Sequence, residues 1–120
     1  MYIKSIHWLD KICQEAEVEV SDSEYDITCF SQPCKYLEKQ NINEPLECIN
    51  VKNIMLASED IFKVKKIDNR YGYMICGKLI NDFGLIQIGS IILHIDESII
   101  PKDIVVNNYV IFYTDRIDLW

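Results

Sequence analysis

The chain has 120 residues, of which 49% are hydrophobic and 26% are charged, a composition typical of a soluble globular protein. Twelve basic and nineteen acidic residues give a net charge of −7, which argues against a duplex nucleic acid as the partner. The apolar runs, such as residues 91–93 and 104–106, are much shorter than the roughly 20 residues of a membrane span. We therefore expect one soluble domain covering residues 1–120 and no membrane partner.

The cysteine content indicates a reducing compartment. The N-terminal residues show no basic segment followed by an apolar stretch and a cleavage site, so we expect no signal peptide. The number of cysteines is odd, which predicts free thiols and a cytoplasmic location. Cys29 and Cys34 are the one close pair, whereas a structural zinc site normally has two, so we expect no metal and no cofactor. Cys29 and Cys76 are expected to be buried, and Cys34 to be the accessible thiol of a loop.

Period-two alternation of apolar and polar residues is the dominant pattern. It is clearest in residues 15–20 and 25–29, which are separated by turn-forming residues and predict a β-hairpin. We expect a register in which Val18 faces Ile27 on the apolar side. On the polar side, the same register places Glu19 directly opposite Asp26, a repulsive pair that destabilises the hairpin.

Several other strands are expected along the chain. Residues 31–45 predict a loop with one helical turn near residues 35–39, and residues 46–56 a strand with a bulge near residues 50–53. Residues 58–60 have the composition of a helix N-terminus, whereas residues 62–67 alternate like a strand. Turns at residues 68–70 and 81–84 predict hairpins that contain residues 71–80 and 85–95. In the second hairpin Ile80 is expected to face Leu85 and Lys78 to face Gln87.

The two ends of the chain complete the expected set of elements. A last strand is expected at residues 109–119, and residues 2–9 fit either a strand or a short amphipathic helix. Gly77 and Gly89 fall inside expected strands, where glycine often marks a bulge or a sharp bend. Seven or eight short strands must close a barrel or stack in two sheets to bury their apolar faces. We expect a mainly β fold, a small, strongly bent OB-like barrel, with a two-sheet β-sandwich as the alternative.

No catalytic motif is present. Ser31, Cys29 and Cys34 are candidate nucleophiles, and His7 and His94 are candidate bases, but no sequence signature surrounds any of them. His94 is expected to be a structural histidine. We therefore expect a binding protein rather than an enzyme.

The acidic hairpin is the first candidate site. Its outward face is expected to carry Glu15, Glu17, Glu19 and Asp26. Such a face can dock a basic protein partner with fast, salt-sensitive association. Small acidic inhibitors and immunity proteins that neutralise basic toxins work in this way, and they provide the functional analogy.

The second candidate site is the basic hairpin within residues 63–73. This segment interleaves four cations with two tyrosines. The candidate ligand-binding residues in it are Lys65, Lys66, Arg70, Tyr71 and Tyr73. On an OB-like surface this combination can stack bases and contact phosphates. The alternative function is therefore a module that binds single-stranded nucleic acid or another ligand.

Overall fold

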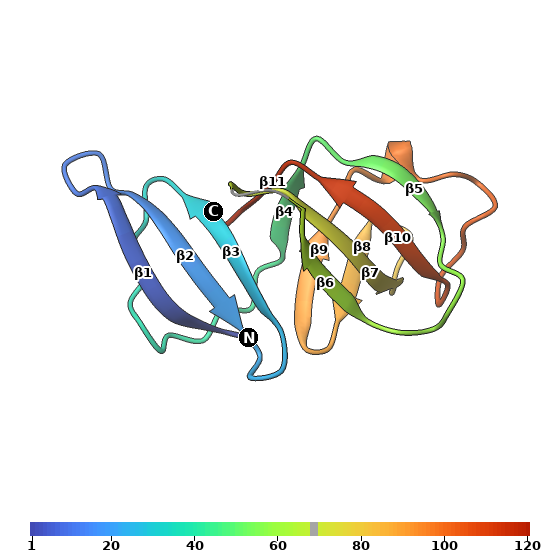
Figure 1. Ribbon diagram of the computed structural model, residues 1–120, viewed down its shortest axis with the longest axis horizontal. Coiled ribbons are helices and arrows are strands. Elements are labelled where there is room, and N and C mark those ends of the chain that lie inside the picture. Colours follow the sequence, from blue (N-terminus) through green and yellow to red (C-terminus); the bar gives the residue numbers. More distant parts are fainter. Residues whose placement is uncertain (68–69) are drawn as a thin grey trace.

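A computed structural model describes residues 1–67 and 70–120 of the chain (Figure 1). Nearly all of its regular structure is β-strand. The first six strands are β1 (Tyr2–Asp10), β2 (Glu15–Ser21), β3 (Asp26–Ser31), β4 (Leu46–Ile49), β5 (Lys52–Leu56) and β6 (Lys63–Lys66). The others are β7 (Tyr73–Leu79), β8 (Leu85–Ile88), β9 (Ile91–His94), β10 (Tyr109–Thr114) and β11 (Arg116–Asp118), with a 3-10 helix, η1, at Glu97–Ile99.

All eleven strands belong to one sheet. Their order is β1-β2-β3-β11-β4-β9-β8-β7-β10-β5, and β6 pairs with β7 outside this path. Most neighbours are antiparallel, while β11 is parallel to β3 and β4 is parallel to β9. The end strands β1 and β5 do not pair with each other, so the sheet is not closed. The mainly β prediction is confirmed, but the sheet is open and not a closed barrel.

The expected long strands are divided into shorter ones at specific residues. Asn50 and Asn53 have φ angles of 56° and 58°, which end the ladder of β4 and split residues 46–56 into two strands with different partners. Gly89, at φ 58°, forms a two-residue turn between β8 and β9, so residues 85–95 are a hairpin. Residues 109–119 are divided at Asp115 into β10 and β11. The strands on the two sides of each division pair with different neighbours in the open sheet.

Gly77 marks the point at which one edge of β7 changes partner. The first half of β7 pairs with β6, and residues Lys78 and Leu79 pair with β8 on that side. A Cβ atom at Gly77 would lie 2.6 Å from Cγ2 of Ile86 and 2.9 Å from the carbonyl oxygen of Gln87. The absence of a side chain at Gly77 therefore permits the close approach of β8.

The N-terminal residues form a strand, because β1 pairs with β2 along its length. The β2–β3 hairpin has the expected faces, but its register is shifted by two residues. Val18 pairs with Cys29, and Glu19 pairs with Thr28. The predicted opposition of Val18 and Ile27 and of Glu19 and Asp26 is therefore wrong.

The side chain of Asp22 accounts for this register. Its Oδ1 accepts hydrogen bonds from the backbone N–H groups of Glu24 (2.9 Å) and Tyr25 (2.7 Å). These bonds hold residues 22–25 in a four-residue turn, so the ladder resumes with Ser21 opposite Asp26. A shift of two residues preserves the inward and outward faces.

Other local predictions have mixed outcomes. The 81–84 turn is confirmed, since Ile80 N–H donates to the Leu85 carbonyl (2.9 Å) and Lys78 pairs with Gln87. The strand predicted at residues 62–67 is confirmed as β6. The expected 68–70 turn falls partly on residues 68–69, which lie outside the described residues. Residues 58–60 are a bend and not a helix start.

Residues 31–45 form a loop, as predicted, but without the helical turn near residues 35–39. This loop lies along the free edge of β1: Ile3 N–H donates to the Gln40 carbonyl, and Lys39 N–H donates to the Ile3 carbonyl. Cys34 and Ile42 are buried in the core. The backbone of the loop is thus bonded to β1 instead of to its own helical turn.

The core is one continuous cluster to which both halves of the sheet contribute. Side chains from β2 and β3 pack with side chains from β8, β9 and β10, among them Val18, Ile27, Ile88, Ile91 and Phe112, all at most 1% exposed. None of the helical structure in the described ranges is long and apolar enough to cross a membrane.

Candidate functional site

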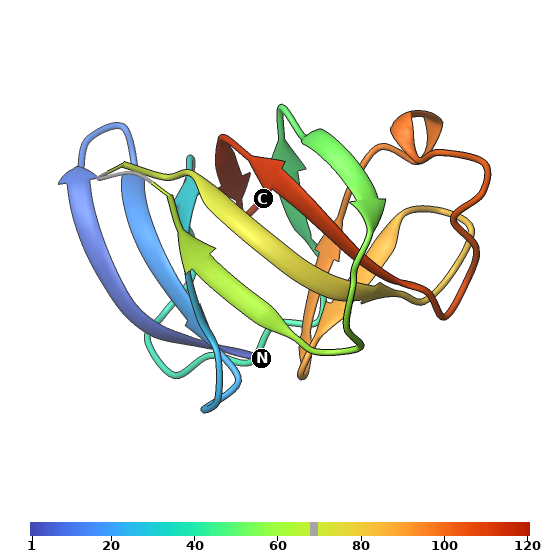
Figure 2. The same cartoon turned by 45° about the vertical axis from the view of Figure 1, so that its right-hand side comes forward.

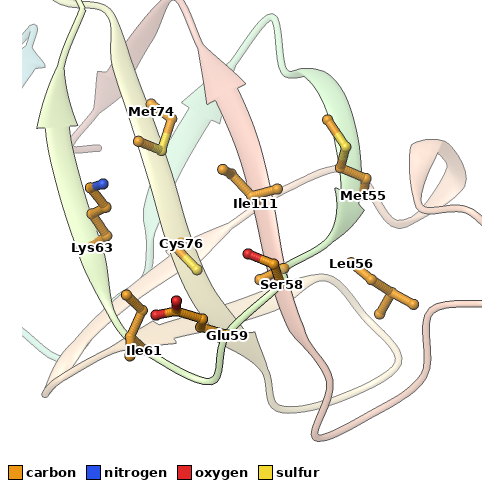
Figure 3. A pocket seen from close by; sticks show the side chains of 10 residues that line it. Met55, Leu56, Ser58, Glu59, Ile61, Lys63, Met74, Cys76 and Ile111 are labelled. Carbon is orange, nitrogen blue, oxygen red and sulfur yellow. The ribbon is translucent and has the colours of Figure 1, made fainter.

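An apolar groove lies on the outer face of β5, β10, β7 and β6 (Figure 3). Register defines its floor, because one cross-strand row contains Met55, Ile111, Cys76 and Lys63. Met74 occupies the next row, and the connection between β5 and β6 forms a wall with residues such as Ile61. The groove has a volume of about 390 Å³.

The groove keeps apolar side chains in contact with solvent. Met55 is 53% exposed, Leu56 49% and Ile61 48%. In Figure 3 the side chains of Met74, Ile111 and Cys76 rise from neighbouring strands on the same side of the sheet. A concave apolar surface with methionines at its border is typical of sites that accept apolar side chains of a partner.

The border of the groove carries both signs of charge, because it is lined by Lys63 of β6 and by Glu59 of the β5–β6 connection. Lys63 and Lys65 pair with Cys76 and Met74, so they project from the same face as the groove. Within the described ranges, neither lysine has a carboxylate within ion-pairing distance. Burial raises the pKa of the Cys76 thiol, Lys63 opposes this effect, and the carboxylates of Asp60 and Glu59 add to it. The thiol is therefore protonated at neutral pH and acts as an apolar group of the floor.

The acidic residues of the first candidate site are partly neutralised within the chain. Glu15, Glu17 and Glu19 project from the outward face of β2 and are half-buried. The ammonium group of Lys4 lies 3.3 Å from Glu19 Oε1 and 3.1 Å from Asp26 Oδ2. These two carboxylates are thus bridged by a cation and are not a repulsive pair.

Glu17 also has a partner within the chain, because the Tyr71 hydroxyl donates to its Oε1 at 2.7 Å. This bond, followed by burial, raises the pKa of Tyr71. Phe30 is the cross-strand partner of Glu17. The guanidinium of Arg116 lies 4.7 Å from the centre of the Phe30 ring, so a cation is near this part of β2. Arg116 forms two hydrogen bonds with the buried carboxylate of Asp118, at 2.6 and 2.8 Å. The surface around the outward face of β2 therefore carries positive side chains, from β1 and β11, as well as negative ones.

Two further acidic residues are cross-strand neighbours in the adjoining β1–β2 hairpin. Asp10 of β1 pairs directly with Glu15 of β2. Asp10 Oδ1 accepts hydrogen bonds from the N–H groups of Ile12 (3.0 Å) and Cys13 (3.2 Å), and these bonds lower the pKa of Asp10. The Asp10 carboxylate is thus held in the β1–β2 turn by backbone N–H groups.

The residues of the second candidate site do not share one surface. Lys65 and Lys66 are exposed on β6, and Arg70 is exposed where the described chain resumes. Tyr73 is 5% exposed, and its hydroxyl accepts a hydrogen bond from Thr28 N–H at 2.9 Å. Both tyrosines therefore connect the β6–β7 hairpin to β2 and β3. Tyr73 is the cross-strand partner of Lys66, but its ring is buried and does not form an exposed stacking surface.

The sequence contained a partial signal for the groove. Tyr109, Ile111 and Tyr113 occupy alternate, outward positions of β10. Their alternation marks a face of a strand, but it does not show which residues of β5 and β7 lie beside them. Tyr113 lies in a row with Met74 and Lys65, a combination that only the strand pairing reveals.

The candidate catalytic groups either form structural hydrogen bonds or lie apart from one another. The ring nitrogens of His94 lie 2.7 Å from Glu47 Oε2 and 3.1 Å from the Phe83 carbonyl, as expected of a structural histidine. Ser31 is buried and donates its hydroxyl to the Leu119 carbonyl. His7 is exposed and lies opposite Glu17.

The positions of the cysteines differ from expectation at one residue. All five thiols are free; Cys29 and Cys76 are buried as expected, but Cys34 is buried too, and Cys13 is the exposed one. The loop places Cys34 inside because its N–H donates to the Gln14 carbonyl at 2.7 Å. Across residues 1–67 and 70–120, no three His, Cys, Asp or Glu side chains converge as metal ligands would.

Comparisons with known proteins give one match. Neither the curated proteins nor the solved structures contain a match to the chain. A family model described as "Uncharacterised conserved protein UCP019853" matches residues 1–119. Because this match covers nearly the whole chain, the protein belongs to the family Uncharacterised conserved protein UCP019853.

Proposed function

We propose that the protein is a non-catalytic binding protein, and that it holds an apolar segment of a protein partner in the groove over β5, β10, β7 and β6. The observation that carries the proposal is the apolar groove over the cross-strand row of Met55, Ile111 and Cys76, in which Met55 is half exposed. Full burial of one such side chain contributes about 1.5–3 kcal/mol. Covering Met55, Leu56 and Ile61 therefore supplies several kcal/mol to a complex.

The charges beside the groove indicate the chemistry of the partner segment. Lys63 and Lys65 project from the groove face and lack carboxylate partners within the described ranges. A segment that places acidic residues over β6 and apolar residues over the floor would complement these lysines, whereas Glu59 would repel acidic residues placed over the β5–β6 connection. Five free cysteines support a reducing compartment, and we place the protein in the cytoplasm.

The second candidate function is an inhibitor-like or immunity-type protein that docks a basic partner through the acidic hairpin. Asp10 and Glu15 favour it, because they are adjacent cross-strand acids that form no ion pair within the described ranges. A basic side chain of a partner would pair with these carboxylates. Glu17, Glu19 and Asp26 already have partners within the chain, so this surface is expected to contribute less than the groove.

The test is a selection of random twelve-residue peptides displayed on phage, followed by affinity measurements with purified peptides. We expect apolar, acidic peptides whose affinity falls at least tenfold with Met55→Glu. The matched control is Leu37→Glu, which places the same charge at a side chain that is 73% exposed in the 31–45 loop. Equal affinity for wild type and Met55→Glu would overturn the groove as the site.

Two further probes separate the other functions. Selection of basic peptides whose binding is lost with Glu15→Gln would favour the acidic hairpin as the binding site instead. A twenty-nucleotide oligothymidylate tests the remaining alternative, a module for single-stranded nucleic acid. Tyr113 and Lys65 would carry that function, since they lie in the same row across β10, β7 and β6. Tight, salt-sensitive binding of this oligonucleotide with no peptide bound would overturn the protein-partner proposal.

A further inference from the structure

Within residues 1–67 and 70–120, three strands of the sheet have only one neighbouring strand, namely β1, β5 and β6. A free strand edge presents unpaired N–H and C=O groups, and proteins normally cover such an edge or protect it with charge. The three free edges of this sheet differ in how they are protected.

The edges of β1 and β6 are protected in different ways. The 31–45 loop covers the first half of β1 through hydrogen bonds between Ile3 and residues 39–40, and Glu38 Oε1 accepts from Ile6 N–H. The ladder of β1 also has register shifts near both of its ends. Strand β6 has the sequence Lys-Val-Lys-Lys, and its three lysines are exposed. Lysine on an edge strand opposes pairing with another chain.

Strand β5 has neither form of protection over its second half. Its one charged residue, Lys52, lies at its start and contacts Asp115 at 3.4 Å. Ile54, Met55 and Leu56 are apolar, and no hydrogen bond of the described chain reaches them except those of the β10 ladder. Met55 and Leu56 are about half exposed. This edge is thus apolar, uncharged and unpaired.

The direction of the free backbone groups follows from the pairing with β10. Ala57 N–H donates to the Tyr109 carbonyl at 2.9 Å, and Met55 is opposite Ile111. In an antiparallel pair, alternate residues direct their backbone groups toward the partner strand. The N–H and C=O groups of Ile54 and Leu56 therefore point away from β10, toward solvent.

We propose that a segment of the partner binds in extended form as an additional strand on the β5 edge, hydrogen-bonded to Ile54 and Leu56. This inference rests on the proposed groove function and states how the partner binds. An added strand lies about 4.8 Å from β5, and its alternate side chains stand beside Met55 on the groove face. Backbone pairing thus supplies the affinity, and the groove selects the side chains.

The structure favours a short partner segment over a second copy of this chain. The register shift in β5, where Asn53 has a φ of 58°, leaves a straight stretch of only a few residues. Such a stretch accommodates a short peptide strand but little of an extended interface.

The test uses the peptides selected for the groove and the variant Leu56→Pro. Proline removes the outward N–H of Leu56, and an edge strand tolerates it where that N–H faces solvent. We expect at least a tenfold loss of affinity. The matched control is Val64→Pro, which places proline on the other free edge, in β6, and should leave the affinity within twofold of wild type.

A second measurement does not depend on the folding of a variant. Each backbone nitrogen of the selected peptide is methylated in turn, and the affinity for the wild-type protein is measured. We expect losses at every second position, because alternate N–H groups of an added strand face β5. In the complex, the amides of Ile54 and Leu56 should exchange with deuterium more slowly than in the free protein.

The outcomes separate the two proposals. Peptides that require Met55 but show neither the Leu56→Pro loss nor the period-two methylation pattern would overturn strand addition and leave the groove function standing. Peptides that do not depend on Met55 would overturn the groove function. A concentration-dependent dimer in sedimentation that Leu56→Pro dissociates would identify a second copy as the occupant of the β5 edge and overturn the inference.

Discussion

Tyr71 and Glu17 are 54 residues apart in the chain, and the hydroxyl of Tyr71 donates a hydrogen bond of 2.7 Å to Glu17 Oε1. One belongs to the basic hairpin and the other to the acidic hairpin. Figure 2 shows the β6–β7 hairpin reaching across the molecule toward β1 and β2. The two segments that the sequence offers as separate sites therefore contact each other.

The substitution Tyr71→Phe is expected to destabilise the protein by about 1 kcal/mol, because it removes one hydrogen bond from a half-buried carboxylate. Urea denaturation measures the change. Tyr113→Phe is the matched control, since the Tyr113 hydroxyl has no hydrogen bond within the described ranges. Equal effects of the two substitutions would contradict a stabilising role for the Tyr71–Glu17 bond.

The same bond predicts a pH dependence. The pKa of Tyr71 is raised in the folded state, first by its hydrogen bond to Glu17 and then by burial. Its contribution is therefore fully present below the unfolded pKa near 10 and is lost as pH rises through the higher folded pKa. The stability difference between wild type and Tyr71→Phe should narrow above about pH 10. A difference that stays constant through this range would argue against the linkage.

The substitution Glu19→Gln is expected to leave the hairpin slightly less stable, by less than about 1 kcal/mol. The expected Glu19–Asp26 repulsion would have made it stabilising, but Lys4 lies between the two carboxylates. In a Lys4→Met background, Glu19→Gln should instead stabilise the hairpin. Glu19 then has no cation beside it, so removing its charge removes only its repulsion with other acids. A double-mutant cycle in urea measures both values, and stabilisation by Glu19→Gln alone would contradict the ion pairs.

The substitution Asp22→Asn is expected to cost about 1.5–3 kcal/mol at neutral pH. Asp22 joins two turns, because its Oδ2 accepts from Ser90 N–H at 2.7 Å while Oδ1 holds its own turn. An asparagine can preserve one of these oxygens but not both. Asp103→Asn, at an exposed aspartate, provides the control.

The acid dependence of this contribution has a defined sign. Burial alone would raise the pKa of Asp22, but the hydrogen bonds from Ser90, Tyr25 and Glu24 outweigh it and lower the pKa below 3.8. The stabilisation is therefore present above pH 3.8 and lost as pH falls through the lower folded pKa. Thermal unfolding of wild type and Asp22→Asn should converge in strong acid.

Thiol labelling of the native protein should modify Cys13 first, since it is the exposed cysteine, and leave the other four largely unmodified. The rate at Cys13 should be modest, because the carboxylate of Asp10 raises its pKa. Cys13→Ser should abolish the early phase of a colorimetric thiol assay. Rapid modification that persists in this variant would indicate that a buried cysteine, such as Cys34, is accessible.

The sequence by itself determined the strand content and the faces of most strands. Alternation in β2, with Ala16, Val18 and Val20 inward, requires the glutamates to face outward in any register. The Ile80–Leu85 turn was also predictable, because a short turn fixes its own register through local bonds. Local chemistry and the period of two were sufficient for these features.

The tertiary structure alone decided the pairing and therefore the sites. The bonds of Asp22 shift the β2–β3 register by two residues, and the φ angles of Asn50 and Asn53 divide an expected strand. The groove combines β5, β10, β7 and β6, so it depends on which strands become neighbours. Which strands become neighbours depends on the burial of side chains from distant segments in one core. The alternation within a single strand does not specify those neighbours.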